Sequence, residues 1–379
     1  MSEWSIEDTT YMEEAIQLAR QGLYTTHPNP RVGCVLVKEG NIIGRGFHLR
    51  AGEGHAEVNA LKEAGDAARG ATAYVTLEPC SHYGRTPPCA VGLIKAGVVR
   101  VVSAMQDPNP EVAGRGIQML QHAGIDCSVG LLNAQSHDLN PGFIKRMETG
   151  MPWVRVKLAM SLDGRTAMQS GESQWITGTP ARQDVQRLRA RSAAIVTGIG
   201  SIQLDDSSLT VREAELGLDN AAEIVKQQPL RVVLDSTGQL SPAAKILQQP
   251  GRTLWVTSGE REMPHAQVLA AQQASDGRID LHWLLRYLAA TEQTNEVLVE
   301  AGAQLAGAFV EAGLVDELIV YMAPTLLGSD ARPLLQLPLD KMAQQKRLIM
   351  TDLRQLGDDL RLTYRFDNNP ESDVEEGSV

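Results

Sequence analysis

The first 150 residues alternate between two hydrophobic periodicities. Residues 8–22 carry apolar side chains at helical spacing, and Gly22 ends the run. Two short apolar runs, 33–38 and 41–46, then flank Glu39-Gly40, and this arrangement predicts a β-hairpin. Further runs predict helices over 54–64, 90–96 and 113–123 and strands over 71–77 and 98–104. Helices and strands in this order predict a three-layer α/β domain.

The pattern restarts after residues 147–152, where Gly150 and Pro152 interrupt the periodicity. A helix is predicted over 180–191 with Thr179 as its N-cap, and another over 303–312. Strands are predicted over 154–159, 194–197, 231–235, 254–257, 297–300 and 318–321. We therefore predict a first domain over 1–149, a second α/β domain over 150–367, and an acidic tail over 368–379 whose composition predicts disorder.

Composition narrows the classes of function that fit this chain. The net charge is -11 and no basic run is present, which weighs against nucleic acid as a partner because phosphate contacts need Lys and Arg. Four cysteines do not make a disulfide framework. The sequence shows neither a signal peptide nor a long apolar span. We therefore expect a cytoplasmic protein that does not bind membranes and meets any anionic small substrate with a few local cationic side chains.

One segment carries the residue types of a catalytic metal site. His55, Cys80 and Cys89 can fill three corners of a zinc tetrahedron and leave the fourth corner for water, as catalytic zinc sites do. Glu57 lies two residues after His55 and is well placed to move protons on that water. A His-x-Glu motif followed by Pro-Cys and a later Cys is typical of zinc deaminases that act on cytosine-like or adenine-like rings.

The cysteine spacing leaves a structural alternative open. Zinc deaminases commonly place their cysteines as C-x-x-C, whereas eight residues separate Cys80 from Cys89. A structural zinc staple, or no metal at all, would also account for these residues. Glu57 favours the catalytic interpretation, because a staple has no use for a carboxylate at that place. Cys34 and Cys127 lie in strand-like runs and are interpreted as buried core thiols.

A glycine-rich turn is the most informative feature of the second half. Residues 302–307 follow a buried strand-like run and open a helical one, so their backbone N–H groups can hold a pyrophosphate. Close packing of the glycines would explain the same pattern, and the usual G-x-G-x-x-G fingerprint is absent. The residues alone leave both interpretations open.

Three motifs of the first half occur in a distinctive order. They are His27-Pro28-Asn29-Pro30-x-Val32-Gly33, His55-Ala56-Glu57, and Glu78-Pro79-Cys80-Ser81-His82-x-Gly84-Arg85-Thr86-Pro87-Pro88-Cys89. They closely resemble the bacterial family of bifunctional riboflavin-biosynthesis deaminase/reductases, which has the same long loop between its cysteines. The resemblance implies a cytidine-deaminase-like fold and an Asn29 that faces the substrate ring, with a plain turn role as the alternative. His48 and His82 are further polar candidates, and His82 either contacts substrate or packs within its loop.

The resemblance continues through residues 157–164, 173–176, 205–212 and 300–307. It implies a reductase domain that is similar to dihydrofolate reductase in fold and uses NADPH. The residues implied to contact this cofactor are Ala159, Trp175, Ser201, Asp205, Ser236, Gly302, Ala303, Gln304, Leu305, Ala306, Gly307 and Ala308. The residues implied to contact the substrate are Ser173, Arg189, Leu209, Arg212 and Glu300. The chain departs from the family pattern at two positions, with Ser201 where Thr is usual and Ser207 where Pro is common.

These features together predict a bifunctional enzyme with one zinc per chain and NADPH. The first domain would hydrolyse the 2-amino group of a diaminohydroxy-phosphoribosylaminopyrimidine, and the second would reduce the ribosyl chain of the product to ribityl. Arg189 and Arg212 can each fork onto substrate phosphate oxygens, with surface ion pairs as the alternative. A homo-oligomer is also expected. Two rival functions are a nucleic-acid base deaminase, which the acidic charge opposes, and a non-catalytic zinc-stapled scaffold, which Glu57 opposes.

Overall fold

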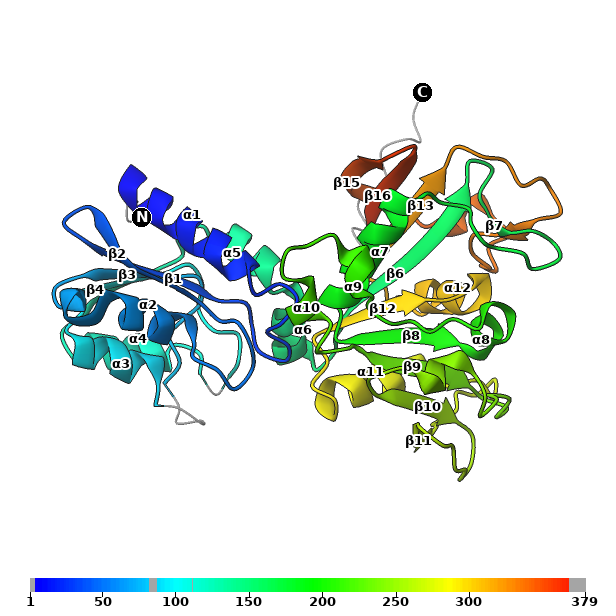
Figure 1. Cartoon of the computed structure of the whole chain (residues 1–379), viewed down its shortest axis with the longest axis horizontal. Helices are drawn as coiled ribbons and strands as arrows, with labels where there is room; N and C mark the ends of the chain where they lie inside the picture. The colour runs from blue at the N-terminus through cyan, green and yellow to red at the C-terminus, as the bar shows by residue number, and fades with distance from the viewer. Residues whose placement is uncertain (1–3, 82–86, 111, 368–379) are drawn as a thin grey trace. The chain divides into compact units, whose positions relative to one another are not determined.

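The computed structural model describes residues 4–81, 87–110 and 112–367 of the chain (Figure 1). The chain divides into two compact units. The first unit extends to Pro152 and also includes Leu288–Asn295, and the second comprises Trp153–Tyr287 and the chain from Glu296 onward. None of the helices in these described stretches combines the length and the hydropathy needed to cross a lipid bilayer.

The first unit is built on a five-stranded sheet with the strand order β2-β1-β3-β4-β5. Its strands are β1 (Gly33–Lys38), β2 (Asn41–Phe47), β3 (Thr72–Val75), β4 (Arg100–Ser103) and β5 (Asp126–Val129). β1 is antiparallel to β2 and β3, and β3, β4 and β5 are parallel. The helices are α1 (Ile6–Arg20), α2 (Ala56–Ala64), α3 (Cys89–Ala96), α4 (Arg115–His122), α5 (Asn133–Leu139) and α6 (Pro141–Thr149), with a 3-10 turn η1 (Gly65–Ala68).

The two faces of this sheet pack against different helices because side chains alternate along each strand. Cys34 and Leu36 of β1 belong to a core shared with α2, α3 and α4. Val35 and Val37 of the same strand belong to a core shared with α1 and α5. The prediction of a three-layer α/β domain is therefore confirmed for this unit.

A buried carboxylate fastens α1 to the sheet. Asp8, which is 6% exposed, accepts hydrogen bonds from the Arg100 guanidinium at 2.7 and 3.3 Å and from the Tyr74 hydroxyl at 2.7 Å. The Arg100 guanidinium holds the pKa of Asp8 well below its usual range. The charged carboxylate therefore stabilises the packing of α1 on β3 and β4.

Replacing Asp8 with Ala should lower the free energy of unfolding of this unit by about 2–3 kcal/mol, because Tyr74 and Arg100 lose a buried charged acceptor. The folded-state pKa of Asp8 lies below its unfolded value of about 3.9. The stabilisation is therefore complete above that unfolded pKa and is lost as the pH falls toward the folded one. Denaturant unfolding of both proteins at neutral pH and at about pH 3 measures this difference. A difference that does not shrink in acid would contradict the linkage.

The second unit is built on a nine-stranded sheet with the order β11-β10-β9-β8-β12-β6-β13-β16-β15. Neighbours from β11 to β13 are parallel, and β16 and β15 are added antiparallel. The strands are β6 (Trp153–Ser161), β8 (Ala194–Gly198), β9 (Leu230–Asp235), β10 (Thr253–Thr257), β11 (Gln267–Ala270), β12 (Glu296–Glu300), β13 (Glu317–Ala323), β15 (Leu348–Leu356) and β16 (Asp359–Phe366). β7 (Arg165–Ala167) and β14 (Arg332–Pro333) form a separate antiparallel pair.

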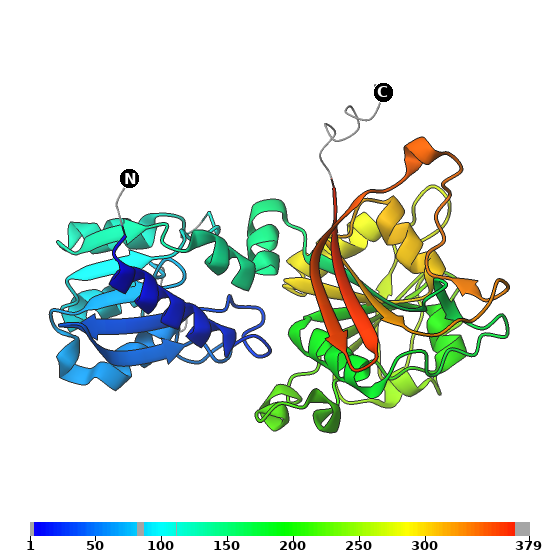
Figure 2. The same ribbon diagram turned by 90° about the horizontal axis from the view of Figure 1, so that it is seen from above.

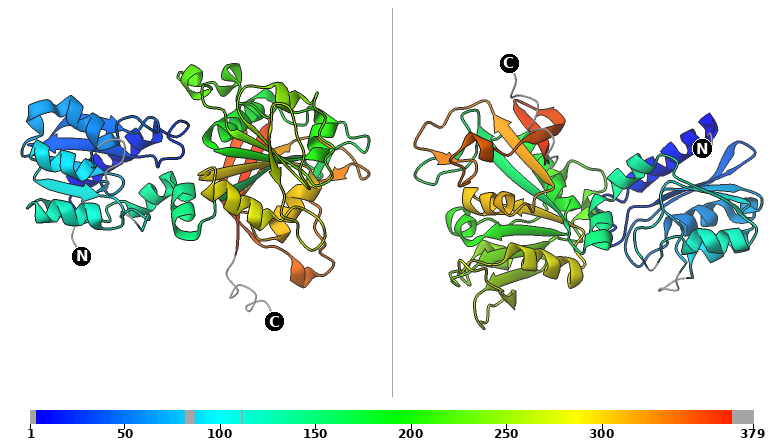
Figure 3. Two further views of the ribbon diagram at one scale, coloured as in Figure 1. Left: turned by 90° about the horizontal axis from the view of Figure 1, so that it is seen from below. Right: turned by 180° about the vertical axis from the view of Figure 1, so that it is seen from behind.

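Helices cover both faces of this sheet, with α7 on one face and α11 and α12 on the other (Figures 2 and 3). They are α7 (Thr179–Arg191), α8 (Ile199–Asp205), α9 (Glu213–Leu216), α10 (Ala221–Ile224), α11 (Leu281–Ala290) and α12 (Ala303–Glu311), with 3-10 turns η2 (Lys245–Gln248) and η3 (Met342–Gln344). The core under α7 joins Val185 and Leu188 of that helix to Leu298 and Tyr321 of the sheet. The predicted second α/β domain is confirmed.

One predicted helix end is wrong. The N-cap of α7 is Gly178, not Thr179. Gly178 has extended backbone angles, with φ -73° and ψ 176°, whereas Thr179 is already helical and Pro180 occupies the second position. Proline is tolerated in the first turn because the N–H groups there have no partner within the helix.

Candidate active sites

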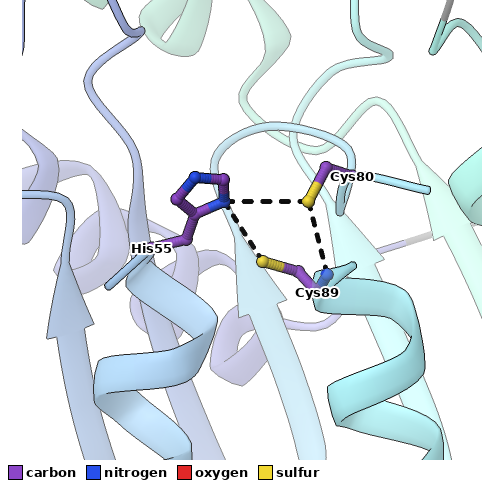
Figure 4. A group of neighbouring side chains, drawn as sticks. All are labelled: His55, Cys80 and Cys89. Carbon is purple, nitrogen blue, oxygen red and sulfur yellow. Dashed lines mark hydrogen bonds between the residues drawn. The ribbon is translucent and has the colours of Figure 1, made fainter. Parts of the chain in front are cut away.

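The three predicted metal ligands come from three different elements and converge (Figure 4). His55 is the N-cap residue of α2, Cys89 is the first residue of α3, and Cys80 lies in the segment after β3. His55 Nδ1 lies 3.7 Å from Cys80 Sγ and 3.3 Å from Cys89 Sγ. Zinc bonds of about 2.0 Å to nitrogen and about 2.3 Å to sulfur place tetrahedral ligand atoms about 3.6 Å apart. The donor set therefore fits zinc.

The two thiols of this site are already polarised for metal binding. Hydrogen bonds from the Cys89 thiol, from His55 and from the Cys89 backbone N–H at 3.3 Å lower the pKa of Cys80 to about 4. The same pairing with Cys80, together with burial, raises the pKa of Cys89. Zinc would deprotonate this thiol on binding, because a thiol bound to a cation is deprotonated.

Glu57 lies in the first turn of α2, two residues after His55, and is only 3% exposed. Burial and the charge of Cys80 raise the pKa of Glu57 to about 7. A carboxyl group with a pKa near neutrality can both take and return a proton. The structure thus places the predicted acid–base residue inside the site.

Asn29 and His48 lie beside the metal ligands. The His48 ring meets the His55 ring edge-on, with 5.2 Å between centroids. His48 Nε2 lies 3.0 Å from Asn29 Nδ2, and Nδ1 lies 3.2 Å from the Gly54 carbonyl oxygen. Burial lowers the pKa of His48, so the ring is neutral at physiological pH. The position of Asn29 suits the predicted substrate contact, whereas His82 lies outside the described residues.

No role was predicted for Glu78, although it directly precedes the Pro79-Cys80 pair. Its buried carboxylate accepts hydrogen bonds from four backbone N–H groups. The donors are Asp107 at 3.2 Å, Gly114 at 2.9 Å, Gly116 at 2.8 Å and Ile117 at 3.3 Å. Glu78 thereby caps the start of α4 and ties it to the segment that carries Cys80.

Replacing Glu78 with Gln should weaken zinc retention by about 10- to 100-fold, because groups that hold a ligand in place contribute to metal affinity on that scale. The amide puts a donor where backbone N–H groups need an acceptor, so Cys80 loses its fixed position. The rate of zinc transfer to a chelator measures the effect, with the NADPH-dependent reaction of the same chain as the control. Unchanged zinc release would contradict this role for Glu78.

The predicted cofactor contacts of the second unit gather at one edge of its sheet. Ala159 lies near the end of β6, Ser201 follows β8, Ser236 follows β9 and Gly302 follows β12. The carboxyl ends of parallel neighbours meet at the same edge, which is where open α/β sheets bind ligands. The Gly302 N–H donates to Ser201 Oγ at 3.3 Å and joins two of these turns.

The glycine-rich turn has two parts with different surroundings. Gly302 is the N-cap of α12, and the first helical turn, Ala303, Gln304 and Leu305, is at least partly exposed. Ala306 and Gly307 are buried, and a Cβ on Gly307 would lie 2.1 Å from the Gln336 carbonyl oxygen. The packing interpretation therefore holds for Gly307. The exposed first turn offers its backbone N–H groups to a ligand, while Ala308 lies one turn further along, half-buried.

The remaining predicted contacts differ in exposure. Ser173 Oγ donates to Asp205 Oδ1 at 2.9 Å. Trp175 is 67% exposed, and the Arg182 guanidinium lies 4.7 Å from its ring centroid. Leu209, in contrast, is buried in the core under α7.

Glu300 is the centre of a buried charge cluster. It accepts two hydrogen bonds from the Arg189 guanidinium, at 2.6 and 3.0 Å, and Arg189 also donates to the Thr210 carbonyl at 3.2 Å. Burial alone would raise the pKa of Glu300, but the charges of Arg189 and Lys157 hold it below its usual range. Lys157 of β6 is the register partner of Glu300 on β12. No role for Lys157 was predicted, although a cation within a largely apolar strand is a signal that could have found it.

Arg212 has a looser partner. Its guanidinium pairs with Glu215 at 2.6 Å, and the two side chains are 44% and 39% exposed. Such exposed pairs are worth no more than about 1 kcal/mol. Arg212 can therefore exchange its ion pair with Glu215 for one with a more highly charged anion such as a phosphate. The Arg189 guanidinium, in contrast, is already paired with the buried Glu300.

Comparison with known proteins identifies the family. Residues 5–105 match the cytidine and deoxycytidylate deaminase zinc-binding region, and residues 152–362 match the RibD C-terminal domain. The riboflavin biosynthesis protein RibD of Escherichia coli is 54% identical over 94% of this chain and 99% of its own length. The chain belongs to the RibD family. RibD of Haemophilus influenzae is 52% identical over 96% of this chain and 99% of its own.

Solved structures agree with this assignment. Acinetobacter baumannii RibD is 50% identical, covers 96% of this chain and 99% of its own, and superposes with a TM-score of 0.90. A Thermotoga maritima protein described as a diaminohydroxyphosphoribosylaminopyrimidine deaminase/5-amino-6-(5-phosphoribosylamino)uracil reductase is 31% identical, covers 95% and 99%, and has a TM-score of 0.84. The predicted fold, the bifunctional deaminase/reductase activity in riboflavin biosynthesis, and the cofactors zinc and NADPH are confirmed.

Proposed function

We propose that the first domain, residues 1–149, hydrolyses the 2-amino group of diaminohydroxyphosphoribosylaminopyrimidine, and that the second, residues 150–367, reduces the ribosyl chain of the deaminated product with NADPH. The proposed deaminase activity rests on one observation: His55, Cys80 and Cys89 converge beside the buried Glu57. The Thermotoga maritima relative is described by both activities. A free-cysteine chain also suits a cytoplasmic enzyme, because disulfides are rare there.

Glu57 is the proton carrier of the deamination in this proposal. His55, Cys80 and Cys89 would hold zinc, which supplies Lewis-acid activation of water near neutral pH. Glu57 takes one proton from the attacking water, whose oxygen bonds to the ring carbon. The same carboxyl group then gives that proton to the departing amino group, which leaves as ammonia. Asn29 holds the ring while this happens.

In the reductase domain the charge cluster positions the substrate. NADPH, when bound, supplies a hydride to the ribosyl carbon, and proximity is then the main device that the protein must provide. The exposed turn of α12 suits the cofactor phosphates. Glu300 accepts hydroxyl donors of the ribosyl chain, and Arg212 leaves Glu215 to meet the 5-phosphate. Arg189 holds Glu300 rather than the phosphate, because all its observed hydrogen bonds go to Glu300 and Thr210.

A split assay tests this proposal. The zinc-loaded protein receives the phosphoribosylaminopyrimidine alone and then with NADPH, while ammonia release and NADPH absorbance are followed. Ammonia first and NADPH oxidation second is the expected order. Ammonia without NADPH oxidation would remove the proposed second reaction, and no ammonia would return the zinc site to a structural role.

We also propose a homo-oligomer, with β15 as part of its interface. β15 is the edge strand of the nine-stranded sheet, and its exposed side chains include Leu348, Ile349, Met350 and Leu353. An apolar edge strand left in water invites pairing with another chain, so proteins normally cover or charge it. A second copy of this chain would provide that cover.

Replacing Ile349 with Lys should shift the protein toward monomers by at least about tenfold in dissociation constant, since a buried cation costs more than about 1.4 kcal/mol. Sedimentation velocity over a range of concentrations measures the shift. Gln345→Lys, which adds the same single positive charge at an exposed residue just before β15, is the control for charge alone. A wild-type protein that is monomeric at all concentrations would contradict the proposal.

A further inference from the structure

Two hydrogen bonds connect the backbone at Gly54 to Asn29 through the His48 ring. The Gly54 carbonyl oxygen can only accept, so His48 Nδ1, 3.2 Å away, must carry the ring proton. In a neutral imidazole the other nitrogen is then an acceptor. Asn29 Nδ2 lies 3.0 Å from that nitrogen, so the amide must turn its NH₂ group toward His48.

The His48 ring is held in this orientation from several sides. Its side chain is buried, and its backbone N–H donates to the Val32 carbonyl at 2.9 Å. The Gly54 carbonyl is itself fixed, because Asn59 Nδ2 donates to it at 3.2 Å and to the Phe47 carbonyl at 2.9 Å. The ring also rests edge-on against His55. The tautomer of His48 is therefore determined by the protein and not by the ligand.

This arrangement leaves Asn29 with one defined polarity. With one N–H of its NH₂ group held by His48, the amide has its acceptor Oδ1 in a fixed position. Within the described part of the chain no hydrogen bond is seen to Oδ1. An Asn side chain that can turn either way can place its oxygen or its NH₂ group at a given point, whereas the contact with His48 fixes the place of Oδ1, and a ligand group facing that oxygen must donate.

We infer that His48 is a positioning residue that fixes the amide of Asn29, so that Asn29 Oδ1 accepts a hydrogen bond from a ring N–H of the substrate. This inference rests on the proposed deamination and on Asn29 facing the ring. It names the ligand class as an aminopyrimidinone with a protonated ring nitrogen beside the amino-bearing carbon. A cytosine-like ring has an unprotonated nitrogen at that place, and its lone pair would meet the lone pairs of Oδ1. A buried polar mismatch of this kind gives strong discrimination.

The test compares His48→Met with His48→Gln in the zinc-loaded, full-length protein. Met removes the acceptor that orients Asn29, and kcat/KM for ammonia release from the phosphoribosylaminopyrimidine should fall about 10- to 100-fold, the scale of one lost buried hydrogen bond. Gln has a side-chain oxygen that can accept from Asn29 Nδ2, so it should restore most of the rate. Zinc content and the NADPH-dependent reaction should stay unchanged in both variants.

A double-mutant cycle with Asn29→Ala separates this role from a structural one. If His48 acts through Asn29, His48→Met should cost little further in the Asn29→Ala background. A full additional cost there would overturn the inference and assign His48 to the packing of His55. An Asn29→Ala variant as active as the wild type would overturn it too, while a wild type that releases no ammonia would remove the proposed function itself.

Discussion

Replacing Glu57 with Gln is expected to lower the rate of ammonia release by about 10²- to 10⁴-fold, the usual contribution of a positioned general acid–base group. The amide has nearly the same size as the buried carboxylate, so the packing at the start of α2 is kept. It cannot take a proton from water, and the three residues whose ligand atoms group at this site in the described part of the chain, His55, Cys80 and Cys89, include no carboxylate that could replace it. Zinc content should remain at one per chain, because the ligands are His55, Cys80 and Cys89.

Two controls show whether the loss of ammonia release in Glu57→Gln is specific to that residue. Glu63→Gln changes an exposed carboxylate on the same helix and should leave ammonia release unchanged. NADPH oxidation with the already deaminated substrate should be the same in Glu57→Gln and in the wild type. A Glu57→Gln protein that still releases ammonia at the wild-type rate would remove the acid–base assignment, and loss of both reactions would indicate misfolding.

The fold could be predicted where local chemistry and packing agree. The hairpin between β1 and β2 is an example, because Glu39 and Gly40 both take positive φ angles of 52° and 76° at the position where the hydrophobic runs break. The β15–β16 hairpin could not be predicted in this way. β15 has exposed apolar side chains at consecutive positions, 348–350, so it lacks the alternation that marks a half-buried strand.

The zinc site could be predicted because its chemistry needs rare residue types in a fixed order. His55, Glu57, Cys80 and Cys89 are recognisable before any contact is known. The residues that hold these ligands in position could not be recognised in the same way. Glu78 binds backbone N–H groups some 29 to 39 positions away, and backbone groups leave no trace in a sequence.

The reductase residues are an intermediate case. The resemblance implied that Glu300 and Arg189 contact the substrate. It did not predict the two hydrogen bonds from Arg189 to Glu300, because they depend on the packing of α7 against β12. Lys157 joins them because β6 and β12 are parallel neighbours in register. These contacts change the expectation for Arg189, which is engaged with Glu300, and leave Arg212 as the phosphate ligand that we propose.

Glu300→Gln is the second change from which we expect a large effect. The substitution keeps the shape of the side chain but removes the charge that Arg189 and Lys157 face in a buried site. A hydrogen bond to a charged group is worth about 1.5–3 kcal/mol, so kcat/KM for NADPH-dependent reduction should fall by about 10- to 100-fold. Ammonia release should be unchanged, because Glu300 belongs to the second unit.

Steady-state reduction of the deaminated substrate measures this effect, with Glu311→Gln, an exposed change at the end of α12, as the matched control. Thermal unfolding of both variants shows whether the cluster mainly supports the fold, because a broken buried ion pair costs about 3–5 kcal/mol of stability. A variant that unfolds much earlier yet keeps its kcat/KM when folded would make Glu300 a structural residue. A stable variant that loses reduction but keeps full ammonia release would instead show that the two activities are separate on one chain. Glu57→Gln is the complementary variant, because it should lose ammonia release and keep reduction.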